Sequence, residues 1–264
     1  MLTVGVDLAA EPERSAVAWI EWALGRAVIR DVIWGADDGL ILDAIAQADK
    51  AAIDCPLGWP DAFVAFVAAH QAGQVIAPEG VAGRDWRRSL AMRVTDLAVA
   101  KEAKLTPLSV SADRIGHVAM RCASLLGQLA RQGHVVDRSG SGVVVEVYPA
   151  ASLKIWGLPY RGYKRPGGTQ DLGRLVDRLL VAAPWLEFGE PEMLCRRSHD
   201  ATDAVVAALT ARAASQNLTL RPRTQEEVSA ASTEGWIAIP APGSQLCQAE
   251  LCGVGGHRAH AAAP

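Results

Sequence analysis

The chain has 264 residues, 50% of them hydrophobic and 21% charged, so it can bury a substantial core as one large domain or as a domain with an insertion. It shows no run of about 18 apolar residues, no basic-then-apolar leader and only five scattered cysteines, which excludes a membrane span and a secreted disulfide framework and favours the cytoplasm. The formal net charge of −3 gives no general attraction for nucleic acid, so such a partner requires a local basic patch.

Three runs rich in Val, Ile and Trp open the chain, at residues 2–8, 15–22 and 27–34. The turn-like segments AEPER and LGR join them, which predicts a three-stranded antiparallel meander. Residues 38–48 have apolar side chains at helical spacing, and the short apolar strand that follows ends on Asp54 before Pro56.

The segment 58–106 is looser, and we interpret it as an insertion with helices at 61–72 and 87–103. Residues 111–132 predict a long helix with Ser111 as its N-cap. The run GVVVEVYPA then predicts a strand that carries Glu146 and ends at Pro149, and helices are expected at 172–182 and 198–214.

This order of elements predicts an RNase H-like α/β fold, in which the antiparallel meander is extended by parallel strands and flanked by helices. A Rossmann fold would require helices between the first strands and a Gly-x-Gly-x-x-Gly turn, and the sequence has neither. We expect a single domain over residues 1–240, with the helical insertion at about 58–106, and a tail at 241–264.

Five acids stand where they could converge. Asp7, Asp54 and Glu146 lie at or near the carboxyl ends of predicted central strands, and Asp200 and Asp203 are one helical turn apart. A buried carboxylate without a partner costs several kcal/mol, and no basic residues are interleaved with these acids. Hard oxygen ligands suit Mg²⁺ or Mn²⁺, and two such ions about 4 Å apart can activate a water against a phosphodiester.

Each acid also has a simpler interpretation. Asp7 or Asp54 alone is more often a turn former than a ligand, and Glu146 is compatible with an edge strand. Asp200 is also what the start of a helix favours, because an acid there offsets the helix dipole. It is their joint occurrence that favours a metal site.

Two basic and aromatic clusters accompany the acids. Arg84, Arg87 and Arg88 would share a helix face, where they could meet phosphates while Trp86 stacks on a base, although a solvated helix face is an equal alternative. Lys154 and Lys164 belong to a second cluster, which includes the loop YRGYKR after Glu146 and would border the metal site.

The motifs VGVDLA, AIDCPLGWP, RVTD, VEVYPA, HDATDAVVAALTAR and EGWIAIP together resemble the family catalogued as domain of unknown function 429, described as predicted RNase H-like nucleases. The resemblance runs from about residue 2 to residue 240, and the last acidic motif is similar to that of RuvC-type resolvases. It implies a metal-binding set of Asp7, Glu146 or Asp54, and Asp203 with Asp200. It also implies a site-facing, substrate-binding role for Arg93 and Asp96.

The sequence therefore predicts a metal-dependent nuclease acting on nucleic acid or a small phosphodiester, with its oligomeric state open. One alternative is an ATP-binding phosphotransferase of the actin-like and sugar-kinase superfamily, although glutamates occupy its expected phosphate turn. Another is a binding module that kept the fold without catalysis. The tail has zinc-competent residues without the spacing of a standard finger, so a structural zinc there is the less favoured interpretation: Cys247, Cys252, His257 and His260.

Overall fold

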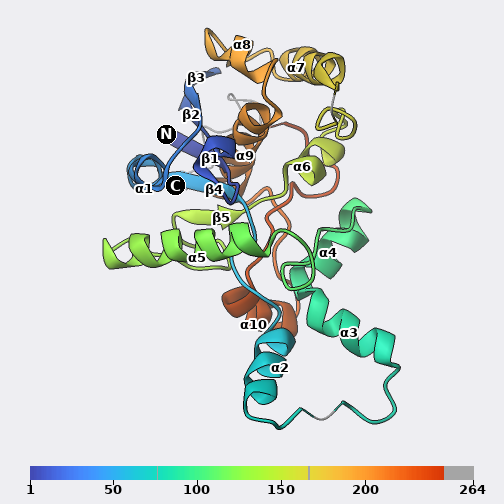
Figure 1. Cartoon of the computed structure of the whole chain (residues 1–264). Helices are drawn as coiled ribbons and strands as arrows, with labels where there is room; N and C mark the ends of the chain where they lie inside the picture. Colours follow the sequence, from blue (N-terminus) through green and yellow to red (C-terminus); the bar gives the residue numbers. More distant parts are fainter. Residues whose placement is uncertain (76, 166, 247–264) are drawn as a thin grey trace, which may run out of the picture.

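A computed structural model describes residues 1–75, 77–165 and 167–246. Its strands are β1 (Leu2–Asp7), β2 (Ala16–Ala23), β3 (Arg26–Trp34), β4 (Lys50–Asp54), β5 (Val144–Glu146) and β6 (Leu186–Glu187). They form one sheet in the order β5–β4–β1–β2–β3–β6 (Figure 1). Strands β1, β2 and β3 pair antiparallel, β4 and β5 extend the sheet parallel to β1, and β6 joins β3 in parallel. The α/β fold with a meander extended by parallel strands is thus confirmed.

Helices cover both faces of the sheet. On one face α1 (Asp38–Gln47) and α5 (Gly116–Arg131) pack on apolar side chains of β1 and β4, among them Val4, Val6 and Ile53. On the other face lie α6 (Pro149–Ile155), α7 (Thr169–Ala182) and α9 (His199–Ser215). The remaining helices of the described chain include a short 3-10 helix (Pro12–Arg14), α8 (Pro191–Cys195) and α10 (Gln225–Glu234).

Helix α9 is the central helix of the second face. Residues 200–213 are buried without exception, and most of them are Ala or Val, so the helix can lie close to the sheet. Gly5 of β1 faces it: a Cβ at this position would lie 2.0 Å from the carbonyl oxygen of Ala204 and 2.3 Å from the amide nitrogen of Ala208. Only glycine permits this approach, which sets the position of α9 relative to β1.

The segment between β4 and β5 contains α2 (Asp61–Gln71), α3 (Gly83–Ala91), α4 (Val94–Ala103) and α5. The prediction of a single helix over 87–103 is wrong, because α3 and α4 divide this segment. Arg93 lies between them in an extended conformation and caps the N-terminus of α4, and Asp96 completes the capping box. The helix expected from residue 111 begins at Gly116 instead. Ser111 is not its N-cap, because its hydroxyl donates to the carbonyl oxygen of Leu90, at the end of α3.

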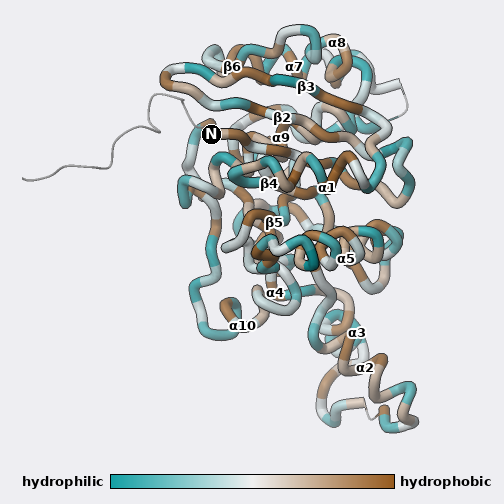
Figure 2. Tube along the Cα trace, turned by 90° about the vertical axis from the view of Figure 1, so that its left-hand side faces the viewer, coloured by the Kyte–Doolittle hydropathy of each residue, from teal (hydrophilic) through white to brown (hydrophobic). Residues whose placement is uncertain are grey.

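Helices α2 and α3 form a hairpin that extends away from the sheet (Figures 1 and 2). Neither helix has a buried residue. Between the two helices Phe66 and Trp86 meet edge to face, with ring centroids 6.0 Å apart. None of the helices in the described part of the chain combines the length and the apolar character needed to cross a membrane.

Candidate metal centre

Two carboxylates lie side by side where the central strands end. Asp7 is the last residue of β1 and Asp54 the last of β4, and the parallel register places these two residues opposite each other. Neighbouring strands are about 4.8 Å apart, so this register alone brings the two acids into contact range. Because side chains alternate along a strand, Asp7 points to the same face as Gly5, the face covered by α9.

The third carboxylate comes from α9. The close approach at Gly5 brings the first turns of this helix to the end of β1, where Asp203 is completely buried. One carboxylate oxygen each from Asp7, Asp54 and Asp203 lies within 4.8 Å of the other two. Three hard oxygen donors at this separation are able to hold a divalent cation such as Mg²⁺ or Mn²⁺.

The raised pKa values of Asp7 and Asp54 indicate that the aspartate cluster is short of positive charge. Burial raises the pKa of Asp7 well above its usual value, and the negative charge of Asp203 adds to this effect. Burial, again with Asp203, raises the pKa of Asp54 to about 7. A cation bound among these carboxylates would favour their ionised forms and oppose the increase in pKa.

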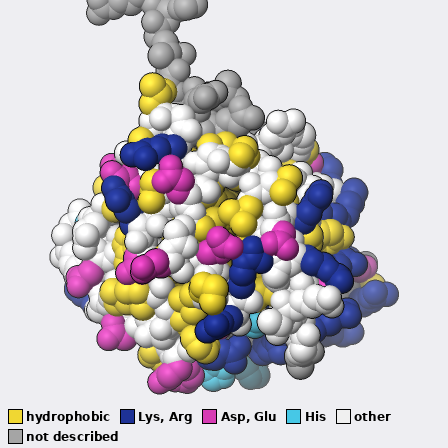
Figure 3. Space-filling view, turned by 90° about the horizontal axis from the view of Figure 1, so that it is seen from above, with side chains coloured by type: hydrophobic (Ala, Val, Ile, Leu, Met, Phe, Trp, Pro, Cys, Tyr) yellow, Lys and Arg dark blue, Asp and Glu magenta, His cyan; other side chains and the backbone are white. Residues whose placement is uncertain are grey.

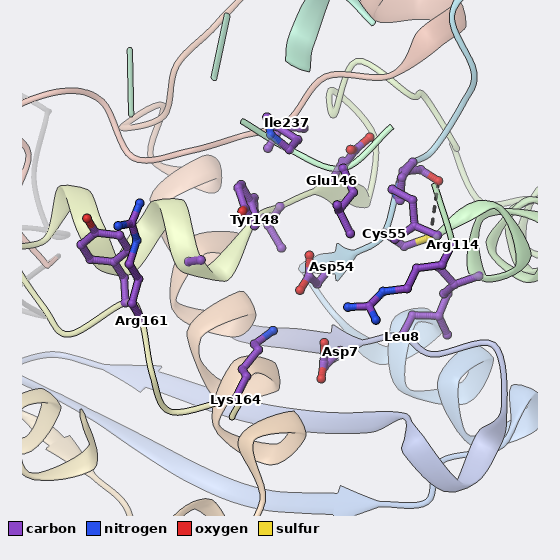
Figure 4. Close-up of a pocket in the computed structure, with 18 of the residues that line it drawn as sticks. Asp7, Leu8, Asp54, Cys55, Arg114, Glu146, Tyr148, Arg161, Lys164 and Ile237 are labelled. Carbon is purple, nitrogen blue, oxygen red and sulfur yellow. Dashed lines mark hydrogen bonds between the residues drawn. The ribbon is translucent and has the colours of Figure 1, made fainter. Parts of the chain in front are cut away.

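The loop between α6 and α7 supplies two groups to Asp203. The Tyr163 hydroxyl donates a hydrogen bond to Asp203 Oδ1 at 2.9 Å, and the Lys164 ammonium forms an ion pair with Asp203 Oδ2. Figure 4 shows the end of Lys164 pointing toward Asp7 and Asp54. Burial opposes the charge of this lysine, but the three aspartates raise its pKa well above the usual value. Lys164 is therefore the counter-ion of the aspartate cluster.

Glu146 is not part of this cluster, and the register of β5 explains why. Glu146 pairs with Ile53 rather than with Asp54, so its side chain points to the same face as Ile53. The residues on either side of Glu146, Val145 in β5 and Val147 just after it, share a buried apolar cluster with Ala207 of α9 instead. The strand thus presents valine where the row of Asp7 and Asp54 would continue.

Arg93 holds Glu146 in a buried network. The guanidinium is 1% exposed, and it donates to Glu146 Oε2 at 2.8 Å and to Glu146 Oε1 at 2.6 Å. Two further bonds reach the Asp96 carboxylate and one reaches the carbonyl oxygen of Glu234, so all five N–H donors are used. Burial opposes the charge, but Glu146 and Asp96 raise the pKa of Arg93 above its usual value. These donors therefore have no capacity left for a substrate.

Asp200 lies one turn before Asp203 and has partners of its own. His199 Nδ1 is 2.8 Å from Asp200 Oδ1, the Trp34 indole nitrogen donates to Oδ2 at 3.2 Å, and Arg14 forms an ion pair at 3.6 Å. Although burial opposes the shift, His199 and Arg14 lower the pKa of Asp200. The structure thus brings together Asp7, Asp54 and Asp203 and leaves Asp200 beside them.

The other predicted substrate-binding residues lie elsewhere. Arg84, Arg87 and Arg88 belong to α3 in the projecting hairpin, where Trp86 packs on Phe66 rather than standing free. The Lys154 ammonium donates to the carbonyl oxygen of Lys104 at 3.2 Å and lies 5.3 Å from the centre of the Tyr160 ring. The predicted tail cluster of cysteines and histidines falls outside the described residues.

A cavity of about 570 Å³ opens over the aspartates (Figure 4). Its lining includes the acids Asp7, Asp54 and Glu146; the cations that line it are Arg93, which is held by its own network, and Arg114, Arg161, Lys164 and Arg165. In Figure 4 the side chain of Arg114 is turned toward the carboxyl groups from the side opposite Lys164. No pattern in the sequence points to Arg114, and Tyr163 is recognisable only as part of the basic and aromatic loop.

A family model described as protein of unknown function (DUF429) matches residues 5–227, which include all three clustered aspartates. No curated protein and no solved structure matches the chain. Because the family model covers most of the sequence, the protein belongs to the DUF429 family.

Proposed function

We propose that the protein is a divalent-metal-dependent phosphodiester hydrolase that uses Mg²⁺ or Mn²⁺ held by Asp7, Asp54 and Asp203. The observation that carries the proposal is the meeting of these three carboxylates, from two strands and a helix, beneath a cavity that Asp7 and Asp54 line. Bound there, the metal would activate a water and stabilise charge on the leaving oxygen of a phosphodiester.

The arrangement of the sheet supports an RNase H-like fold for this chain. An antiparallel meander leads into two parallel strands beside β1, and the acids lie at the carboxyl ends of the two central parallel strands. The same edge of the sheet receives the acidic start of α9. This placement of acids agrees with the resemblance of the sequence motifs to predicted nucleases.

The residues around the aspartates have separate roles in this proposal. Tyr163 fixes the orientation of the Asp203 carboxylate through its hydrogen bond. Arg114, Arg161 and Arg165 line the cavity and would bind the phosphate oxygens of the substrate. The floor would therefore take up the metal while the surrounding cations hold the phosphodiester against it.

The substrate class follows from the distribution of charge. Seen from above, Lys and Arg side chains gather on one side of the molecule, and Asp and Glu are more frequent on the other (Figure 3). The net charge of −3 thus coexists with a locally basic surface. A single-stranded or branched nucleic acid, or a small phosphodiester, is consistent with a cavity of about 570 Å³.

Incubation of the purified protein with Mn²⁺ and single-stranded DNA, RNA, branched DNA or a chromogenic diester tests the proposal. We expect cleavage by the wild type and its loss in Asp7→Asn and Asp203→Asn. Asp43→Asn, at an exposed position of α1, removes one negative charge elsewhere and is expected to keep full activity. Arg114→Ala is expected to raise KM more than it lowers kcat.

No cleavage of any substrate with any divalent metal would contradict the hydrolase. Equal cleavage by the wild type and Asp7→Asn would place the reaction outside the aspartate cluster.

A further inference from the structure

Both carboxylate oxygens of Asp203 already have a partner. Oδ1 accepts the hydrogen bond of Tyr163, whereas Oδ2 is buried, accepts no hydrogen bond within the described residues, and is neutralised by the Lys164 ammonium. A metal ion that takes the buried Oδ2 as a ligand would meet the Lys164 ammonium there, whereas Oδ1 can keep the Tyr163 hydrogen bond. The ion pair is the contact that a second cation replaces directly, because both cations are attracted by the same charge.

We propose that Lys164 is an exchangeable cation of the site, which competes with the divalent metal for the aspartates and is displaced when the metal binds. This proposal rests on the proposed metal site and adds to it a residue that sets the metal affinity. The displaced ammonium stays at the cavity that it lines, where it becomes available to a phosphate oxygen of the substrate.

The surroundings of Lys164 permit this exchange. Its side chain is 46% exposed, so it can move into solvent, although its ammonium reaches a fully buried carboxylate. The only other contact recorded for the ammonium in the described chain is with the Tyr163 ring, at 5.9 Å from the ring centre. Lysine is a point charge on a flexible stem, so its removal breaks no fixed set of hydrogen bonds.

The affinity for Mn²⁺ of the full chain, measured by calorimetric titration at one pH, tests the competition without any substrate. We expect Lys164→Met to bind Mn²⁺ about tenfold more tightly than the wild type, because the competing cation is removed. Lys154→Met is the matched control: it removes the same charge from a lysine that donates to the carbonyl oxygen of Lys104, so its affinity is expected to equal that of the wild type.

Displacement can also be observed in the wild type itself. We expect an amine-reactive reagent, followed by mass spectrometry, to label Lys164 more rapidly after Mn²⁺ is added, while labelling of Lys154 stays the same. Equal Mn²⁺ affinities for the wild type and Lys164→Met, or weaker binding by Lys164→Met, would overturn the exchange and leave the metal site standing. Absence of Mn²⁺ binding in both proteins would overturn the exchange and the proposed metal site together.

Discussion

Two groups of acids lie near each other in this protein, and they differ in the cation that neutralises them. Asp7, Asp54 and Asp203 share the ammonium of Lys164, whose side chain is 46% exposed. Glu146 and Asp96 share the guanidinium of Arg93, whose side chain is 2% exposed. The first group joins β1 and β4 to α9 below the cavity, and the second joins β5 to the start of α4.

The difference separates an available site from a structural one. Arginine offers five donors in a rigid plane, and Arg93 uses every one of them in the folded protein. Lysine offers a mobile point charge, and within the described residues Lys164 forms an ion pair with one buried oxygen. Carboxylates at the ends of neighbouring strands therefore serve different purposes, according to the cation that reaches them.

The largest effect is expected from removal of Arg93. Arg93→Met leaves the carboxylates of Glu146 and Asp96 buried without a counter-ion, and we expect the free energy of unfolding to fall by about 3–5 kcal/mol. Lys164→Met also removes the counter-ion of buried carboxylates, but the raised pKa values of Asp7 and Asp54 let these two groups take up a proton, so we expect a smaller loss than for Arg93→Met. Urea unfolding of both variants gives the comparison, and equal losses would show that the two cations have the same structural role.

A metal titration distinguishes the two groups by function. At a Mn²⁺ concentration of about 100 times Kd, the ion should stabilise the wild type by about 2.7 kcal/mol. We expect Asp7→Asn to lose this response and Glu146→Gln to retain it, although Glu146→Gln starts from a lower stability because it weakens the pair with Arg93. Thermal unfolding with and without Mn²⁺ measures the response of each variant. A response lost in Glu146→Gln but kept in Asp7→Asn would place the ion at Glu146 and Asp96 instead of the aspartate cluster.

Gly5→Ala tests the packing that brings α9 to the aspartates. The new Cβ would meet the backbone of Ala204 and Ala208, so we expect a loss of about 1–3 kcal/mol in the free energy of unfolding. A displaced α9 would also weaken the Mn²⁺ response while leaving the Arg93 network intact. Gly39→Ala is the control, because this exposed position in α1 has room for a Cβ. The variant is expected to keep the stability and the Mn²⁺ response of the wild type.

Much of the framework could be predicted from the sequence. Alternating and β-branched runs define β1, β2 and β3, and the strand ending at Asp54 is marked by Pro56. The helix that carries Asp203 has the strongest pattern in the chain and was placed within one residue at each end. These local patterns were enough to place Asp7, Asp54 and Asp203 at ends of elements that could meet.

The role of Glu146 could not be predicted in this way. Its face depends on which residue of β4 it opposes, and a shift of one residue reverses the face. Nothing in the local sequence sets this register, which arises from pairing with β4 and from the distant Arg93. The same holds for Arg114, which reaches the cavity only through the tertiary fold.

Four short or ambiguous elements, α6, α8, α10 and β6, are not among those predicted from the sequence patterns. Pro149 was interpreted as the end of a strand, but it is also the first residue of α6, where proline is well tolerated. Helix α10 carries a recognisable signal, because Thr224 and Glu227 form a capping box. Strand β6 is two residues long and α8 five, which is too short for a periodic pattern.

The raised carboxylate pKa values are also expected to make the stability depend on pH. The pKa of Asp54 is about 7 in the folded protein, compared with about 3.9 for an unfolded chain. Between these values the folded state retains a proton that the unfolded state has lost, so the free energy of unfolding of the metal-free protein falls as the pH rises from about 4 to about 7. Asp7, whose pKa is also raised, acts in the same direction.

Urea unfolding over this pH interval, in a chelator and in Mn²⁺, measures the effect. Asp54→Asn removes one of the titrating groups, so its metal-free stability should fall less with pH than that of the wild type, whereas Asp43→Asn should follow the wild type. Asp200, whose pKa is lowered, acts in the opposite direction, but mainly below about pH 4, and it is present in all three proteins. Because metal ligands must be deprotonated, Mn²⁺ should bind more tightly as the pH rises and remove the decline. A metal-free stability that rises over the interval in the wild type but not in Asp54→Asn would mean that Lys164 lowers the carboxylate pKa by more than burial raises it.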